Sequence, residues 1–253
     1  MEKQFVAEGS IVRTIWGKSD TVLLVFAGSA AEFALNRSVD WLYFTGRLPA
    51  DPIGRLFSTV RYAREIIYSA EDRALAAIDQ ITAIHGAVEQ NRGMKIPDSA
   101  YRDVLFMLID YTVRSFELLE RGLTAAEKGE IFEVFYRVGA RMHLKGLPVS
   151  YAEFERMRED HLAENLLCGG LTRDLYGRYR KSLGGFRYRV LLGGQALLAP
   201  ERVKQLLELP AGWWMRGVVL FYKIARLIRL DGLVKAIVLP KVYKAQVSAL
   251  DRG

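Results

Sequence analysis

The chain has 253 residues, of which 51% are hydrophobic and 26% charged, and it carries a formal net charge of +7. This composition is typical of a folded globular protein and excludes a disordered chain. The single cysteine, Cys168, excludes an intramolecular disulfide and a thiolate cluster for zinc or iron–sulfur, and it favours a reducing, intracellular compartment.

The amino-terminal sequence MEKQFVAEGSIVRTIW lacks the basic start and apolar core of a secretory signal. The best candidate for a membrane span, TVLLVFAGSAA, ends after eleven residues at Glu32. Because a spanning helix needs about 20 apolar residues, we expect no integral membrane segment.

Helix start signals recur along the chain. Asp51 followed by Pro52 is a candidate N-cap with proline in the first turn. Capping-box spacing, an acidic residue three positions after Ser or Thr, occurs in three pairs: Ser69 and Asp72, Thr124 and Glu127, Ser150 and Glu153. The runs that follow repeat apolar residues with a helical rather than an alternating period. The sequence therefore predicts an all-α fold.

Residues 76–89, AAIDQITAIHGAVE, carry an apolar helix face that a histidine interrupts. Ile78, Ile81 and Val88 share this face with His85. A core histidine bonded to a backbone carbonyl or a neighbouring helix is one interpretation. Motifs for di-iron carboxylate sites, zinc proteases, nucleophile elbows, phosphate loops and dinucleotide binding are absent from the sequence. One chemistry needs only a single protein nitrogen in an apolar cavity, the axial ligation of haem iron.

Other residues suit this chemistry, although each has a simpler interpretation. Ile84 adds to the apolar surroundings, and Gly86 leaves the helix surface bare beside the histidine, unless it is a mere helix irregularity. Arg55 and Thr59 lie four residues apart, so both project from one side of a helix. They suit contact with haem propionates or with bound oxygen, or they are a surface arginine beside a helical threonine.

The order of these motifs carries a resemblance. DPIGRLFST, then AIHGAV some 26 residues after Thr59, then LIDYTVRSFELLERGLTAAEKGEIFEVFYRVGARMHLKGLPVS resembles the haem oxygenase family of fungal MpaB and bacterial latex-clearing protein (rubber oxygenase). The similarity runs from about residue 22 to residue 180. It implies that His85 is the iron ligand of a b-type haem and that Arg55 and Thr59 are catalytic and line the haem pocket. From their positions beside His85, we expect Ile81 and Gly86 to contact the cofactor as well.

Two positions depart from the rubber oxygenases. Ser58 stands where those enzymes carry a lysine that caps the iron, so the resemblance implies an open sixth position here. Thr82 stands where they carry an arginine. Both departures argue against polyisoprene as the substrate. The family's acidic base falls near Asp40, where no motif fixes the alignment.

The favoured function is a haem-dependent oxygenase, an oxidoreductase that acts on an apolar, isoprenoid or otherwise unsaturated substrate. O₂, or peroxide, would bind opposite His85. The alternatives are a non-catalytic haem carrier or gas sensor, and a membrane-associated helical protein without haem. The expected partners are a lipophilic small molecule and O₂, and no nucleic acid, because no recognised binding motif is present.

The positive charge is concentrated at the carboxyl end. We divide the chain into a domain at residues 1–210 and a basic amphipathic helical extension at residues 211–253, which carries eight basic and two acidic side chains. Aromatic residues interleave with seven of these cations over residues 211–244, a pattern that fits a helix lying on an anionic membrane. We expect a cytoplasmic protein, peripheral at the inner face of a membrane. The alternative is helices that pack on the domain with their basic face toward water.

Overall fold

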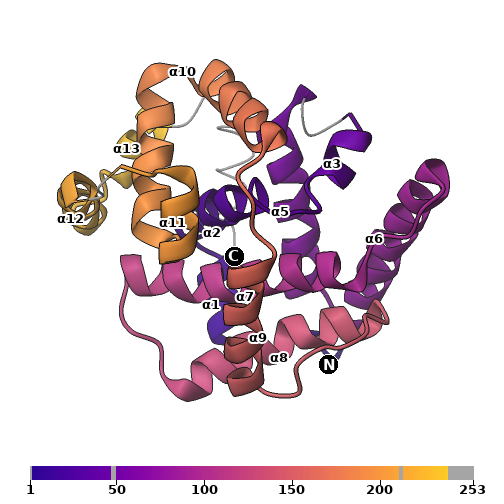
Figure 1. The fold of residues 1–253 in the computed structure, drawn as a ribbon. Coiled ribbons are helices and arrows are strands. Elements are labelled where there is room, and N and C mark those ends of the chain that lie inside the picture. The colour runs from indigo at the N-terminus through magenta and orange to yellow at the C-terminus, as the bar shows by residue number, and fades with distance from the viewer. Residues whose placement is uncertain (1, 47–49, 211–212, 239–253) are drawn as a thin grey trace.

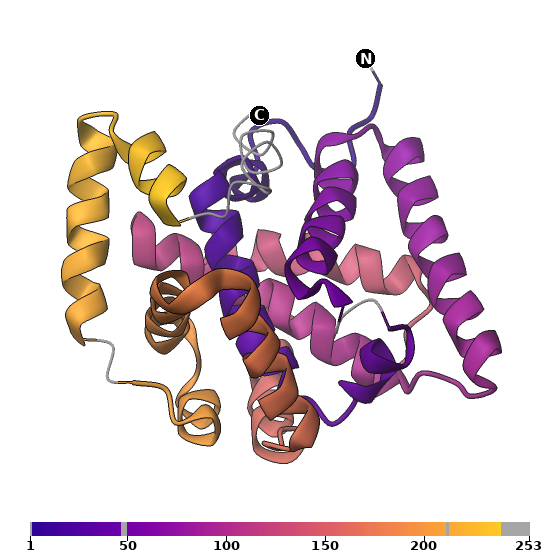
Figure 2. The same ribbon diagram turned by 90° about the horizontal axis from the view of Figure 1, so that it is seen from above.

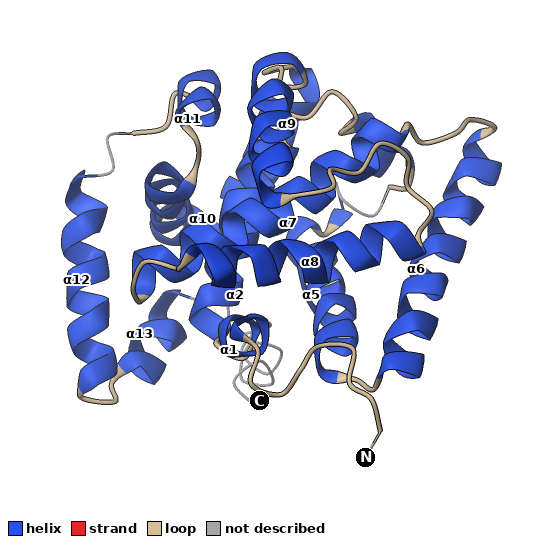
Figure 3. Ribbon diagram, turned by 90° about the horizontal axis from the view of Figure 1, so that it is seen from below, coloured by secondary structure: helices blue, strands red, loops and turns tan. Residues whose placement is uncertain are grey.

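The computed structural model describes residues 2–46, 50–210 and 213–238. Within these ranges the chain folds as helices joined by loops, which confirms the all-α prediction, and extended pairing is limited to two isolated bridges (Figure 3). The helices are α1 (Ile11–Trp16), α2 (Ser19–Phe33), α3 (Asp40–Phe44), α5 (Pro52–Tyr68), α6 (Glu71–Arg92), α7 (Asp98–Leu119), α8 (Ala125–Arg141), α9 (Tyr151–Glu164), α10 (Gly170–Leu198), α11 (Glu201–Leu207), α12 (Trp213–Leu227) and α13 (Asp231–Val238).

The packing of α2 against α7 forms the centre of the fold (Figure 1). Gly28 on α2 allows this close approach, because a Cβ atom there would lie 2.2 Å from Cδ1 of Tyr111 on α7. Tyr111 and Trp16 are fully buried in the same core, and the Trp16 ring meets Phe26 edge to face with 6.1 Å between centroids. The helices α8 and α10 pack around this pair.

Three predicted helix starts are confirmed. The Asp51 side chain accepts a hydrogen bond from the Gly54 amide, and Ser150 accepts one from the Glu153 amide. Thr124 and Glu127 form a complete capping box at the start of α8. These caps satisfy amides that have no partner within their own helix.

The capping box predicted at Ser69 is wrong. Ser69 ends α5, and the N-cap of α6 is Ala70, without a side-chain bond. The amino-terminal segment replaces the missing cap, since the carbonyl of Lys3 accepts from the Glu71 amide at 2.8 Å. A contact between segments so far apart in sequence is invisible to local capping rules.

Two helical pairs stand at opposite ends of the molecule (Figure 2). The helices α5 and α6, joined by two residues, form an antiparallel hairpin at one end, and α12 and α13 lie at the other. In the described ranges, none of the helices combines the length and apolarity needed to cross a membrane.

Candidate functional site

The predicted site residues lie on the two helices of the α5–α6 hairpin. Arg55 and Thr59 are on α5, and Ile81, His85 and Gly86 are on α6. Because each helical residue rises by about 1.5 Å, residues equally far from the two-residue connection lie at the same height. The number of residues between Arg55 and the connection is about the same as the number between the connection and His85. Thr59 and Ile81 form a second such pair, one helical turn closer to the connection. The hairpin therefore brings the backbones of both motifs to one level.

The His85 ring is half-buried and contacts α7. It meets the ring of Tyr101 edge to face, with 5.1 Å between centroids and 76° between planes. Its Nδ1 atom is shielded from solvent. The Tyr101 hydroxyl donates to Oε1 of Glu89 at 3.3 Å, and Glu89 lies one turn after His85 on α6. Tyr101 therefore fixes the histidine ring from one side and is itself fixed by the same helix.

The apolar residues around His85 are more exposed than predicted. Ile78 is fully buried in the core, and Ile81 and Val88 are half-buried. Ile84, expected to flank the histidine in an apolar pocket, is 40% exposed, so that part of the prediction is wrong. The face leaves the core as α6 runs beyond the bundle, so its burial decreases from Ile78 toward the end of the helix.

The helix surface next to His85 is bare. A Cβ atom placed on Gly86 would have nothing within 4 Å. No neighbouring element therefore occupies the place of this Cβ, and a role for Gly86 in cofactor binding stays a prediction.

The short helix α3 contacts the carboxyl-terminal end of α6. Arg92 donates to Oδ2 of Asp40 on α3 at 2.6 Å, and its guanidinium lies 4.0 Å from the Trp41 ring centroid and 5.4 Å from that of Phe44. Arg92 follows His85 by seven residues, so both lie on the same side of α6. Sequence reasoning did not assign Arg92, although this spacing could have drawn attention to it.

Of the two positions that depart from the rubber oxygenases, the structure describes the side chain of Thr82 and not that of Ser58. Thr82 turns back onto its own helix, because its hydroxyl donates to the Ile78 carbonyl at 3.1 Å. Thr59 is half-buried on α5. The side chains of Arg55 and Ser58 lie outside the described part of the structure.

The other histidines are placed very differently. His161 is buried, with only 4% of its surface exposed. Its Nδ1 lies 2.7 Å from Oδ1 of Asp103, and its Nε2 lies 3.0 Å from Oε1 of Glu32. His143 is exposed, with a left-handed backbone at φ 57°.

His161 belongs to a buried charge network of Glu32, Asp103, Asp110, Tyr111, Arg158 and His161. Arg158 on α9 donates to both Glu32 carboxylate oxygens, one of them at 2.5 Å, and to Oδ2 of Asp110 at 3.0 Å. The Tyr111 hydroxyl donates to Glu32 at 3.0 Å. The network thus joins α2, α7 and α9 through charges that burial would otherwise make very costly.

The mutual pairing of these groups sets their pKa values. Burial alone would raise the pKa of the Glu32 carboxyl, but the charge and hydrogen bonds of Arg158, with those of His161, lower it to about 2. Burial alone would lower the pKa of His161, but hydrogen bonds with Asp103 and Glu32 and their charges raise it above its usual value. The protonated ring is therefore favoured, and it has no lone pair for a metal.

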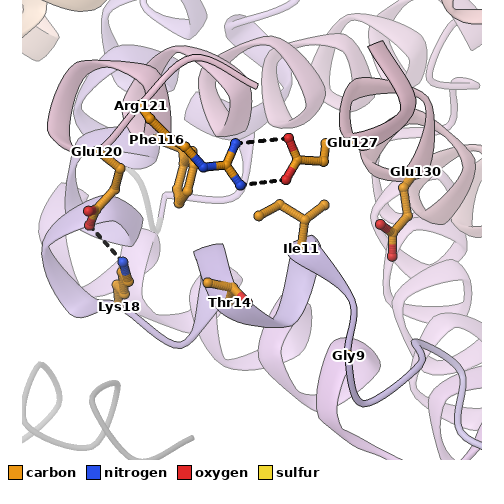
Figure 4. A pocket seen from close by; sticks show the side chains of 9 residues that line it. All are labelled: Gly9, Ile11, Thr14, Lys18, Phe116, Glu120, Arg121, Glu127 and Glu130. Atoms are coloured by element: carbon orange, nitrogen blue, oxygen red, sulfur yellow. Dashed lines mark hydrogen bonds and ion pairs between the residues drawn. The ribbon is translucent and has the colours of Figure 1, made fainter. Parts of the chain in front are cut away.

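A hollow of about 700 Å³ lies away from these residues, between α1 and the α7–α8 connection (Figure 4). Its walls carry two ion pairs, Lys18 with Glu120 at 2.7 Å and Arg121 with Glu127 at 2.6 Å. None of the predicted site residues lines it. Paired charges of this kind do not suit an apolar ligand.

The comparisons with known proteins show the class of the chain. Residues 16–230 match a catalytic-domain family of oxygenases, so the chain is an oxygenase, an oxidoreductase. It belongs to the family described as "ER-bound oxygenase mpaB/B'/Rubber oxygenase, catalytic domain", which confirms the resemblance seen in the motifs. No curated protein and no solved structure matches the chain.

The donor set in the described ranges is compatible with a haem. These residues contain no group of three or more His, Cys, Asp or Glu side chains that could hold a metal ion. A haem needs only one protein nitrogen, because the porphyrin supplies the other four in the plane. His85, oriented by Tyr101 and beside the bare surface of Gly86, is a single imidazole of that kind.

Proposed function

We propose that the protein is a b-type haem-dependent oxygenase in which His85 would hold the haem iron, acting on an apolar, isoprenoid or otherwise unsaturated substrate with O₂ or peroxide. The observation that carries this proposal is the contrast among the three histidines. His161 is held between two carboxylates and His143 is exposed, whereas His85 is half-buried beside an open stretch of helix. A haem supplies, when bound, the oxygen-activating chemistry.

The chain's own residues would bind and orient the cofactor. A histidine ligand needs a fixed ring plane, and the edge of Tyr101 restricts rotation of the His85 ring. Ile81 provides apolar surface next to it, and Gly86 leaves room for close approach. Arg55 would neutralise a propionate from the opposite helix, and the Thr59 hydroxyl would donate or accept a hydrogen bond on the oxygen side.

Two further features support the proposal. The lone cysteine, Cys168, is followed by Gly169, so the chain has no C-x-x-C-H attachment motif, and binding would be non-covalent. The family name includes a rubber oxygenase, and rubber is an apolar hydrocarbon. An apolar substrate of another kind therefore fits both the family and the departures at Ser58 and Thr82.

The absorption spectrum and haem content of the purified protein test the ligand. The wild-type protein should show a Soret band and bind one haem, and His85→Ala should lose the haem or shift the band. His143→Ala, at an exposed histidine, is the matched control and should keep both. A wild-type spectrum in His85→Ala would show that the ligand is wrong, and a wild-type protein without any Soret band would favour the haem-free alternative.

The same sample tests the sixth coordination position and the activity. Imidazole or cyanide should bind the ferric protein readily, because Ser58 replaces the capping lysine. A low-spin spectrum that added imidazole leaves unchanged would contradict this expectation. Consumption of O₂ or peroxide with a lipid-like substrate separates an oxygenase from a haem carrier or gas sensor.

A further inference from the structure

The outer face of α12 and α13 is apolar and exposed. Along α12 the exposed residues recur at the helical period, and Leu227 is 84% and Phe221 63% exposed. The face comprises Trp214, Leu220, Phe221, Ile224, Leu227 and Ile228, and α13 adds Leu233 and Ile237. Contiguous exposed patches of several large apolar side chains mark interaction sites rather than ordinary surface.

The opposite face of α12 is fixed to the domain. Met215 is buried against α10, so closely that a Cβ on Gly193 would lie 2.3 Å from its Cγ. The Tyr222 hydroxyl donates to Asp20 at 2.8 Å, and Arg226 pairs with Glu120 at 2.7 Å. Rotation of α12 to bury its apolar face would break all of these contacts. The exposure is therefore a property of the packed helix.

The charges beside the α12 part of this face have one sign, whereas α13 carries Asp231 in an ion pair with Lys235 at 3.1 Å. Arg216 is exposed and Lys223 half-buried, and their spacing of seven residues places both along the same border of the apolar face. The segment 213–227 contains no acidic residue. Arg226 has its ion pairs on the inner side, so it does not belong to this border.

We propose that the outer face of α12 and α13 docks onto an anionic lipid bilayer, with both helices lying in the plane of the interface. An apolar face bordered by cations matches acyl chains below anionic headgroups, because the long basic side chains reach the phosphates while their helix is partly immersed. A second copy would bring two cationic borders together. A protein partner would need polar groups to pair with, and the centre of this face offers none among its described side chains.

Vesicle co-sedimentation of the full-length chain tests the proposal. The protein should pellet with vesicles of phosphatidylcholine and phosphatidylglycerol at low salt, and less with phosphatidylcholine alone or at high salt. Failure to pellet with the anionic vesicles at low salt would overturn the proposal.

Matched variants locate the surface. Leu227→Glu should weaken vesicle affinity by at least about tenfold, because it removes apolar burial and adds repulsion. Val149→Glu, 82% exposed before α9, is the control and should bind like wild type. Arg216→Gln and Lys223→Gln should each weaken binding to anionic vesicles by about fivefold. Equal binding by Leu227→Glu and wild type would place the contact elsewhere and overturn the assignment.

Sedimentation velocity without lipid tests whether a second copy of the chain, rather than a membrane, binds this face. A concentration-dependent dimer that Leu227→Glu abolishes, together with no vesicle binding, would assign the face to a second copy. None of these measurements needs haem or substrate, so the proposal stands or falls separately from the proposed oxygenase activity.

Discussion

The buried charge network and the α5–α6 hairpin use histidine in opposite ways. His161 lies between Asp103 and Glu32, is 4% exposed, and has both ring nitrogens occupied by carboxylates. His85 lies where a helix leaves the bundle, with one aromatic edge beside it and open space at the next residue. The first arrangement favours a protonated ring, and the second places the ring at the edge of the bundle, where the proposed function assigns it to the haem iron.

The difference teaches that a buried histidine can serve the packing of the fold, so burial alone does not identify a ligand. The network connects α2, α7 and α9 and so determines how the central helices pack. The far end of the hairpin is more exposed, and the proposed function places the cofactor there. Substitutions in the network should therefore change stability, whereas substitutions in the hairpin should change cofactor binding.

The largest expected effect is on the network. Glu32→Gln keeps the shape of the side chain but leaves Arg158 and His161 short of one negative charge at a fully buried site. Removing one partner from a buried ion pair costs about 3–5 kcal/mol. We expect the free energy of unfolding, measured with urea, to fall by this amount.

Glu159→Gln, on the exposed side of α9, is the matched control and should stay within about 0.5 kcal/mol of wild type. A loss below about 1 kcal/mol in Glu32→Gln would mean that the network does not hold the central helices. Under conditions where the variant stays folded, its haem content should equal that of wild type.

Two glycine substitutions separate packing from cofactor access. Gly28→Ala would place a methyl group against the Tyr111 ring, and overpacking of this kind costs about 1–3 kcal/mol of stability. Gly86→Ala meets no protein atom, and its higher helix propensity should stabilise the haem-free protein by up to about 1 kcal/mol. Haem titration of Gly86→Ala should nevertheless show weaker binding. Unchanged haem affinity would remove Gly86 from the site.

The third expected effect is a dependence on pH of the stability that His161 provides. Because the folded-state pKa of His161 is raised, its stabilising contribution is fully present below the unfolded value near 6.5. This contribution is lost as the pH rises through the raised folded-state pKa. The difference in unfolding free energy between wild type and His161→Gln should therefore shrink at alkaline pH, as urea unfolding at a series of pH values would measure. A difference that stays constant over the whole pH range would mean that protonation of the His161 ring does not stabilise the fold.

Local sequence patterns correctly predicted those parts of the fold that depend on residues within one turn of helix. The caps at Asp51, Thr124 and Ser150 and the helical periods fix the elements, because each rule acts within one turn of helix. The prediction of a cap at Ser69 is wrong because the amide of Glu71 is satisfied by the distant carbonyl of Lys3. The family was predictable because its motifs keep their order along the chain.

Long-range pairing was not predictable in the same way. Glu32 reads as the residue that interrupts an apolar stretch, and its partners Arg158 and His161 lie more than a hundred positions later. No periodicity connects such residues, so the sequence does not predict the network. The exposure of Ile84 is equally unpredictable, because the sequence does not show where α6 leaves the bundle.

The smallest expected effect is on the α5 side of the hairpin. Arg55→Ala should weaken haem binding by about tenfold, roughly 1.4 kcal/mol, because a cation near a propionate favours its ionised form and holds the ring. Thr59→Ala should change the haem content less than the turnover, since a hydroxyl on the oxygen side acts only during the reaction. Arg61→Ala, at an exposed position on the same helix, is the control for charge and helix stability. Circular dichroism should show all three variants folded, and haem titration with turnover measurements should rank them. Wild-type haem affinity and turnover in both Arg55→Ala and Thr59→Ala would restrict the functional site to α6 and its neighbours α3 and α7.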